Sequence, residues 1–140
     1  MITYVDTSTL LKLVVDEPGS DVAGRIWVSA DALVAVSLIE VEARAALAAA
    51  VRAGRLSAAE HRRASRNLRV LLDQVDVIDV TGEVVTSACE LAELHGLRGY
   101  DAVHLAAARL VGSDMLTSAD VDLCRAAERE GIPVANPLAN

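Results

Sequence analysis

Four acidic residues lie in or directly after short apolar segments of this sequence: Asp6, Glu42, Asp101 and Asp120. Burying a carboxylate is costly unless a cation neutralises it. Hard divalent ions such as Mg²⁺ and Mn²⁺ are the obvious cations, because they prefer carboxylate oxygens and water. The four acids therefore predict a pocket for a divalent metal, and metal pockets of this kind typically act on phosphates.

Three of the acids also have a purely structural interpretation. Asp6 and Asp101 stand where helices are expected to begin, and aspartate is favoured at such positions. Asp120 follows Thr117 with the T-x-x-D spacing of a capping box, and it also suits a first helical turn, where the helix dipole favours negative charge. For these three residues the sequence leaves capping and metal binding open.

Glu42 is harder to interpret as a capping residue. Ser37 and Glu40 match the S-x-x-E capping box, which assigns the structural role to Glu40. Glu42 lies about 200° further round the helix, on the apolar stripe of Ile39 and Ala46. It has no cationic neighbour four residues before or after it. A buried Glu42 would need a metal or a raised pKa, whereas a solvated position at the edge of the stripe is the alternative.

Alternating strand and helix patterns must position these acids. Strands are expected at 2–5, 33–36, 75–80, 114–117 and 132–135. Helices are expected at 8–15, 20–29, 38–53, 57–73, 82–95, 100–110 and 119–130. The alternation predicts an α/β fold with a parallel sheet covered on both faces. Ligands bind beyond the carboxyl ends of such strands, which is where Asp6 and Asp120 fall.

The composition predicts one globular domain, spanning residues 1–140. A net charge of −7 argues against bulk non-specific binding to nucleic acid. The segment 52–69, here called the arginine arm, differs because it holds six arginines and Glu60 as its one acid. Within it Arg62, Arg66 and Arg69 share one helical face. The arm suits contact with RNA, an acidic partner segment or a second subunit, or it is a solvated surface.

The cellular location is predicted from the absence of membrane-span and signal-peptide patterns. No apolar run is long enough for a membrane span, and the N-terminus lacks the pattern of a signal peptide. Cys89 and Cys124 have no metal-ligand spacing, so they are expected to be buried thiols in a reducing environment. A cytoplasmic location is expected.

Four segments, in this order, resemble a PIN domain: VDTSTLL at 5–11, VEARAAL at 41–47 preceded by Ser37, LRGYDAVHLAAA at 97–108 and LTSAD at 116–120. Over essentially its whole length the chain looks like a VapC-type toxin of a type II toxin–antitoxin pair. The ordered set, with its Tyr-Asp-Ala-Val-His-Leu string, is far more specific than the first acid alone.

The resemblance implies a Rossmann-like fold, with a central parallel sheet of about five strands flanked by helices. It implies an endoribonuclease that uses Mg²⁺ or Mn²⁺ to hydrolyse phosphodiester bonds. The implied catalytic and metal-binding acids are Asp6, Glu42, Asp101 and Asp120. Ser8 matches the small polar residue after the first acid, Thr117 the one before the fourth, and Asp122 is a nearby auxiliary acid.

The resemblance also implies partners. These are an RNA substrate, a cognate VapB-type antitoxin that wraps the toxin and blocks its pocket, and a second copy of the chain in a homodimer. Arg98 lies close enough to Asp101 in sequence to touch a phosphate. His104 lies three residues after Asp101 on the same helical face, where it either hydrogen-bonds an acid or belongs to the core.

Three rival functions are weighed against this interpretation. A haloacid-dehalogenase-like phosphatase needs a second aspartate two residues after the first, but Ser8 stands there, and Lys12 is the only lysine. A non-catalytic binding module on a PIN-like scaffold would have lost an acid, and none is lost. A PIN nuclease of RNA processing without a toxin role stays open, and only analogy with short single-domain toxins argues against it.

Overall fold

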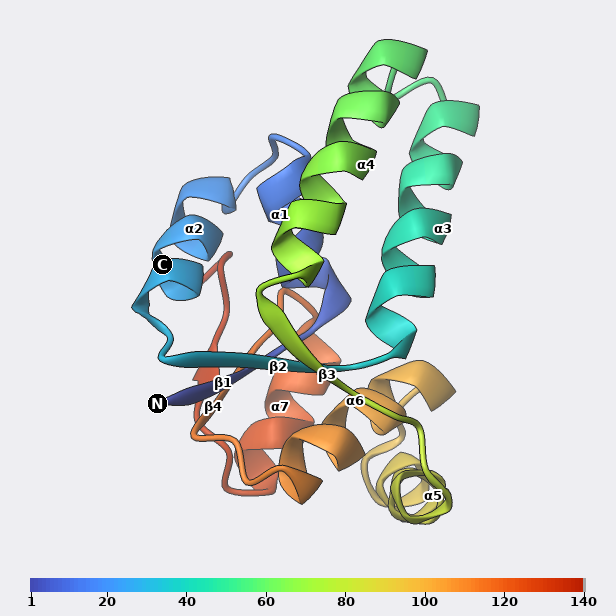
Figure 1. Ribbon diagram of the computed structural model, residues 1–140. Coiled ribbons are helices and arrows are strands. Elements are labelled where there is room, and N and C mark those ends of the chain that lie inside the picture. The colour runs from blue at the N-terminus through green and yellow to red at the C-terminus, as the bar shows by residue number, and fades with distance from the viewer. Residues whose placement is uncertain (140) are drawn as a thin grey trace.

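The computed structural model describes residues 1–139 and shows a sheet between two layers of helices (Figure 1). Within these residues the sheet has five strands, in the order β3-β2-β1-β4-β5. They are β1 (Ile2–Val5), β2 (Ala32–Val36), β3 (Val75–Ile78), β4 (Met115–Thr117) and β5 (Val134–Ala135). Every neighbouring pair is parallel, so the predicted α/β fold with a central parallel sheet is confirmed.

Seven helices connect the strands in residues 1–139. They are α1 (Thr7–Val14), α2 (Ser20–Ser29), α3 (Leu38–Arg52), α4 (Ala58–Leu72), α5 (Gly82–His95), α6 (Gly99–Leu110) and α7 (Val121–Arg129). The expected helices and strands are all found, with ends displaced by at most two residues. In Figure 1, α1 to α4 lie above the sheet and α5 to α7 below it.

Two apolar cores fill the space between the layers. Successive strand residues point to opposite faces, so Val5 packs with Leu10 and Ile39 on one side, while Tyr4 packs with Leu105 on the other. Each fully buried leucine or isoleucine contributes about 1.5–3 kcal/mol relative to an exposed one. These two cores fix α3 on one side of the sheet and α6 on the other, and these are the helices that bring acids to the edge of the sheet.

The start of α3 corrects one expectation. The capping box predicted for Ser37 and Glu40 is wrong, because Ser37 makes no side-chain capping bond. Its φ of −57° and ψ of −21° are already helical, whereas a capping side chain needs an extended backbone. Glu40 instead forms an exposed ion pair with Arg44, at 3.0 Å. By contrast, Ser57 does cap α4, in a complete capping box with Glu60.

The hairpin of α3 and α4 extends away from the sheet (Figure 1). The arginine arm covers the turn of this hairpin and most of α4, and Arg62, Arg66 and Arg69 are all exposed. The buried side of α4 is held by Ala64 and Leu68. The arm is therefore a charged surface on a well-packed helix.

None of the helices within residues 1–139 is both long enough and apolar enough to cross a bilayer.

Candidate active site

The strand order of the sheet reverses between the neighbouring strands β1 and β4. From β1 the chain continues outward through β2 and β3 on one side, whereas β4 and β5 lie on the other side. The crevice outside the carboxyl ends of the strands at such a reversal is where open α/β sheets bind ligands. Asp6 follows β1 directly, and Asp120 follows β4 after a short turn. Glu42 lies on α3 and Asp101 in the first turn of α6.

Asp6 has the capping role that the sequence left open, and it also accepts hydrogen bonds from two side-chain hydroxyls. It is the N-cap of α1, and its Oδ2 accepts a hydrogen bond from the Ser8 backbone N–H, at 3.4 Å. The same oxygen accepts from the hydroxyls of Ser8 at 2.6 Å and of Ser118 at 2.8 Å. Asp6 is only 5% exposed. Its other oxygen, Oδ1, lies 3.6 Å from Nε2 of His104.

Glu42 is held by one oxygen in a similar way. Its Oε1 accepts from the hydroxyl of Thr7 at 3.0 Å and lies 2.5 Å from Nε2 of His104. Burial acts to raise the pKa of Glu42, but the hydrogen bonds from His104 and Thr7 outweigh it, so the pKa is lowered below its ordinary value. Glu42 is therefore a half-buried carboxylate that stays ionised.

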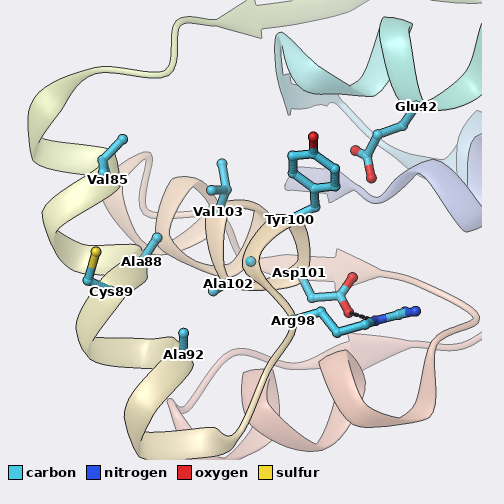
Figure 2. Close-up of a pocket in the computed structure, with 11 residues that line it drawn as sticks. Glu42, Val85, Ala88, Cys89, Ala92, Arg98, Tyr100, Asp101, Ala102 and Val103 are labelled. Carbon is cyan, nitrogen blue, oxygen red and sulfur yellow. Dashed lines mark hydrogen bonds and ion pairs between the residues drawn. The ribbon is translucent and has the colours of Figure 1, made fainter.

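Asp101 and Asp120 share a single cation. Arg98, which is 81% exposed, places its Nε 3.2 Å from Asp101 Oδ2 and its Nη2 3.0 Å from Asp120 Oδ2. Figure 2 shows the contact of Arg98 with Asp101 at the start of α6. Burial and the charge of Asp120 raise the pKa of Asp101, and Arg98 compensates only in part. This end of the site carries excess negative charge.

Asp120 has a further structural task. It is the N-cap of α7, where its Oδ1 accepts from the backbone N–H groups of Asp122 at 2.9 Å and Leu123 at 3.0 Å. With Oδ2 on Arg98, both of its oxygens are engaged.

Asp6, Glu42 and Asp101 share one pattern of hydrogen bonding. Each has one oxygen bonded to a protein donor, whereas no hydrogen bond within residues 1–139 engages Oδ1 of Asp6, Oε2 of Glu42 or Oδ1 of Asp101. Three free carboxylate oxygens with surplus negative charge match the preference of Mg²⁺ or Mn²⁺. The side chains are not drawn together around one point, since no three acids, histidines or cysteines in residues 1–139 form a ready metal cluster.

Comparison with known proteins decides the family. The PIN domain family model matches residues 3–129 of this chain. The chain belongs to the PIN domain family. It is 39% identical over 118 residues to Ribonuclease VapC45 and to Ribonuclease VapC49, from two strains of Mycobacterium tuberculosis, covering 84% of this chain and 82% of each relative. These relatives place the PIN domain among the VapC-type ribonucleases, which confirms the predicted family and enzyme class.

Solved structures share the fold. PAE2754 from Pyrobaculum aerophilum superposes with a TM-score of 0.74 at 23% identity, over 98% of this chain and 92% of that one. VapBC2 from Rickettsia felis, solved bound to a DNA fragment from its promoter, gives a TM-score of 0.69 at 15% identity, over 97% of this chain and 98% of that one. At these identities the likeness concerns the PIN fold alone.

The auxiliary residues expected of this PIN domain differ in their placement. Ser8 contacts Asp6, as described above. Thr117, expected before the fourth acid, shares a hydrogen bond of 3.1 Å with Thr9, and within residues 1–139 its hydroxyl bonds to no carboxylate. Its neighbour Ser118 is the residue that reaches Asp6. Asp122 is exposed in the first turn of α7 and touches the site only through its backbone N–H.

Three hydrogen-bond donors to the acids were missed or left undecided from the sequence. Thr7 and Ser118 carried no signal of their own, because small hydroxyl residues are common at strand ends. His104 was left between an acid partner and a core residue. The structure shows that it is both, since it is fully buried and contacts two acids. Burial acts to lower the pKa of His104, but Glu42, Asp6 and Asp101 outweigh it and raise the pKa.

A mainly apolar pocket of 610 Å³ opens beside the acids. Figure 2 shows Glu42, Arg98 and Asp101 at one end and apolar side chains of α5 along the other. The expectation that both cysteines are buried is wrong for Cys89, which is exposed and lines this pocket. The buried face of α5 is formed by Val84, Ala88 and Leu91, and Cys89 lies outside this face.

Proposed function

We propose that this PIN domain is a metal-dependent endoribonuclease, the toxin of a type II toxin–antitoxin pair, with Mg²⁺ or Mn²⁺ held by Asp6, Glu42 and Asp101. The observation that carries the proposal is the free oxygen on each of these acids, next to a second oxygen that protein donors hold in place. A bound divalent ion supplies an activated water and stabilises charge on the leaving oxygen of a phosphodiester.

The protein's own groups supply orientation. Hydroxyls of Ser8 and Ser118 fix the carboxylate plane of Asp6, and Thr7 with His104 fixes that of Glu42. Fixed carboxylates cost no reorganisation when charge develops in the reaction. Catalytic alignment therefore depends on the packed donors around the first two acids.

Arg98 and Asp120 have a different proposed role. Arg98 is the cation that neutralises Asp101 and Asp120. With a metal bound at Asp101, the attraction between Arg98 and Asp101 would weaken, and the planar guanidinium would suit a phosphate oxygen of RNA. Asp120 then acts on the site by holding Arg98 and by capping α7, and it becomes a fourth metal ligand only if Arg98 leaves it.

The toxin assignment includes a partner. The structural neighbours include toxin–antitoxin complexes, which supports a VapB-type antitoxin for this chain. An antitoxin segment over the acids would block access to them. A homodimer remains part of the proposal, and so does a cytoplasmic location. A PIN nuclease of RNA processing is the second candidate, and an adjacent gene for a short DNA-binding antitoxin would exclude it.

Metal-dependent cleavage is the first test. Purified protein with Mn²⁺ should cut a structured RNA internally, and EDTA should stop the cut. Isothermal titration should show Mn²⁺ binding that Asp6→Asn or Asp101→Asn weakens strongly. Glu40→Ala is the matched control, because Glu40 lies on the same helix as Glu42 but pairs only with exposed Arg44. Unchanged Mn²⁺ binding in both Asn variants would remove these acids from the metal site.

The arginine arm is tested separately. Replacing Arg62, Arg66 and Arg69 together with Gln should weaken RNA affinity and flatten its salt dependence, because fewer counterions are released on binding. Cleavage at saturating RNA should persist, since the acids are untouched. If RNA binding is unaltered but antitoxin binding or sedimentation mass changes, the arm is a protein interface. If nothing changes, it is solvated surface.

A further inference from the structure

A buried chain of side chains connects the sheet to Glu42. The hydroxyl of Tyr4, on β1, lies 2.9 Å from Nδ1 of His104, on α6. Nε2 of the same imidazole lies 2.5 Å from Oε1 of Glu42, on α3. Tyr4 and His104 are both completely buried, with their rings edge to face at 5.8 Å. The hydrogen bond between Tyr4 and His104 is therefore shielded from water.

The hydrogen-bond partners fix the position of each proton in this chain. The Tyr4 oxygen accepts the backbone N–H of Val36, at 3.1 Å. At neutral pH a phenol carries its proton, which the Tyr4 hydroxyl can donate. Within residues 1–139 the available acceptor for that proton is Nδ1 of His104. Nε2 must then carry the imidazole hydrogen and donate it to Glu42.

The alternative arrangements satisfy fewer groups. If Nδ1 carried the hydrogen, Nε2 would face the Glu42 carboxylate with a lone pair at 2.5 Å. If both nitrogens were protonated, the Tyr4 hydroxyl hydrogen would have no acceptor in the described part of the chain. An unpaired buried donor costs about 1–3 kcal/mol, which opposes the charged imidazolium that the neighbouring acids favour. In both the neutral and the charged form, Nε2 carries a hydrogen that it donates to Glu42.

We infer that Tyr4 and His104 form a hydrogen-bond relay that positions Glu42 for metal binding. The inference rests on the proposed metal-binding role of Glu42. The relay engages Oε1 and leaves Oε2 without a hydrogen bond within residues 1–139. Tyr4 thus orients the imidazole of His104, and the imidazole orients the carboxylate of Glu42. Tyr4 and His104 touch no substrate, and both are positioning residues.

A simpler explanation of these contacts is that His104 is a core residue whose hydrogen bonds only stabilise the fold. A merely structural His104 would affect stability but not the specific contribution of Glu42 to metal affinity. A double-mutant cycle on Mn²⁺ affinity separates the two, because coupling between two groups appears only when both are present. The cycle combines Tyr4→Phe with Glu42→Gln.

Tyr4→Phe should weaken Mn²⁺ binding about tenfold, the lower end of the range for groups that orient metal ligands from outside. In the Glu42→Gln background the same change should alter the affinity less than about twofold. Tyr100→Phe, the equivalent change at the other tyrosine, which is 64% exposed, should leave the affinity unchanged. An equal loss in both backgrounds, or no loss in the wild-type background, would overturn the relay.

A second pair of variants keeps the test valid if Tyr4→Phe folds poorly. His104→Gln retains a donor near the position of Nε2, whereas His104→Leu has none. The relay predicts that Gln restores most of the Mn²⁺ affinity that Leu loses. Equal affinities in the two variants would overturn it.

Nitrogen-15 spectroscopy of the imidazole gives a readout that needs no metal. Wild-type protein should show His104 protonated at Nε2, and Tyr4→Phe should disturb that state. Protonation at Nδ1 alone in the wild type would overturn the relay. Failure of wild-type protein to bind Mn²⁺ would instead overturn the proposed function, while the spectrum would still report whether the tyrosine orients the histidine. The two failures are therefore distinguishable.

Discussion

The site has two halves that stabilise their carboxylates by opposite means. We call the half with Asp6 and Glu42 the buried half because most of its donors are buried: they are hydroxyls and an imidazole from α1, α6 and the residue after β4. In the open half, Asp101 and Asp120 share the exposed guanidinium of Arg98, although Asp101 itself is no more exposed than Glu42. Packed donors inside the fold stay in place when a ligand arrives, whereas an exposed arginine can leave at small cost. The buried half is thus preorganised and the open half exchangeable.

The pKa shifts express the same difference. The pKa of Glu42 is lowered, since its donors outweigh burial, and the pKa of Asp101 is raised, since burial and neighbouring acids outweigh Arg98. Glu42 therefore has enough hydrogen bonds to remain ionised without a metal. Asp101 retains unrelieved repulsion, which a divalent cation would remove.

The largest effect is expected from the buried half. Asp6→Asn should lower RNA cleavage by more than the roughly 10–100-fold that outer partners of a metal ligand cost. The reason is that the variant removes a charge and turns an amide toward Ser8 and Ser118. Cleavage rates with Mn²⁺ measure the effect, and circular dichroism checks the fold. An Asp6→Asn protein with wild-type rates would show that the preorganised half is not the catalytic one.

The next largest effect distinguishes the hydroxyls of two neighbouring residues, Ser118 and Thr117. Ser118→Ala should weaken Mn²⁺ binding by about tenfold, because it removes one of the donors that fix Asp6. Thr117→Val is the matched control, since its hydroxyl bonds only Thr9 and its shape is retained. It should change thermal stability more than metal affinity. Titration of both variants with Mn²⁺ measures the two affinities. A larger loss of affinity in Thr117→Val than in Ser118→Ala would restore the role first expected of Thr117.

The Thr117 and Ser118 pair shows where sequence reasoning reaches its limit. Hydrophobic periodicity placed β1 and β4 and so brought Asp6 and Asp120 to one edge, because strand patterns are long and repeated. Which hydroxyl faces a carboxylate depends on a single residue of register at a strand end, where side chains alternate between faces. The capping box predicted for Ser37 was wrong for a related reason, because a capping box depends on backbone angles that the amino-acid sequence alone does not determine.

Glu42 and His104 show the complementary case. The anomaly of an acid on an apolar stripe was visible in the sequence, and it singled out Glu42, which the structure shows bonded to Thr7 and His104. Its partner came from α6, on the other side of the sheet, 62 positions away. No local pattern carries that information, since contact across the sheet edge arises only after both helices pack.

A smaller effect of opposite sign is expected in the open half. Arg98→Gln should strengthen Mn²⁺ binding by up to about fivefold, because an exposed ion pair is worth roughly 0.2–1 kcal/mol and the variant removes the competing cation. RNA affinity should fall in the same protein if Arg98 also contacts phosphate. Paired titrations with Mn²⁺ and with RNA separate the two effects. Weaker Mn²⁺ binding would mean that Arg98 supports the metal site and does not compete with it.

The smallest effect is a difference in pH dependence between the halves of the metal-free protein. Because the pKa of Asp101 is raised above its ordinary 3.8, its favourable contribution to folding is complete below that pH and is lost as pH rises through the folded-state pKa. Because the pKa of Glu42 is lowered below its ordinary 4.5, its contribution is present above that pH and is lost as pH falls through the folded-state pKa.

Two neutral variants should therefore diverge. Relative to wild type, Asp101→Asn should gain stability as pH rises from about 3.5 to 6, and Glu42→Gln should lose it over the same window. Urea unfolding in EDTA at several pH values measures both slopes. Parallel slopes would mean that the two carboxylates experience the same environment, and the division of the site into a preorganised and an exchangeable half would not hold.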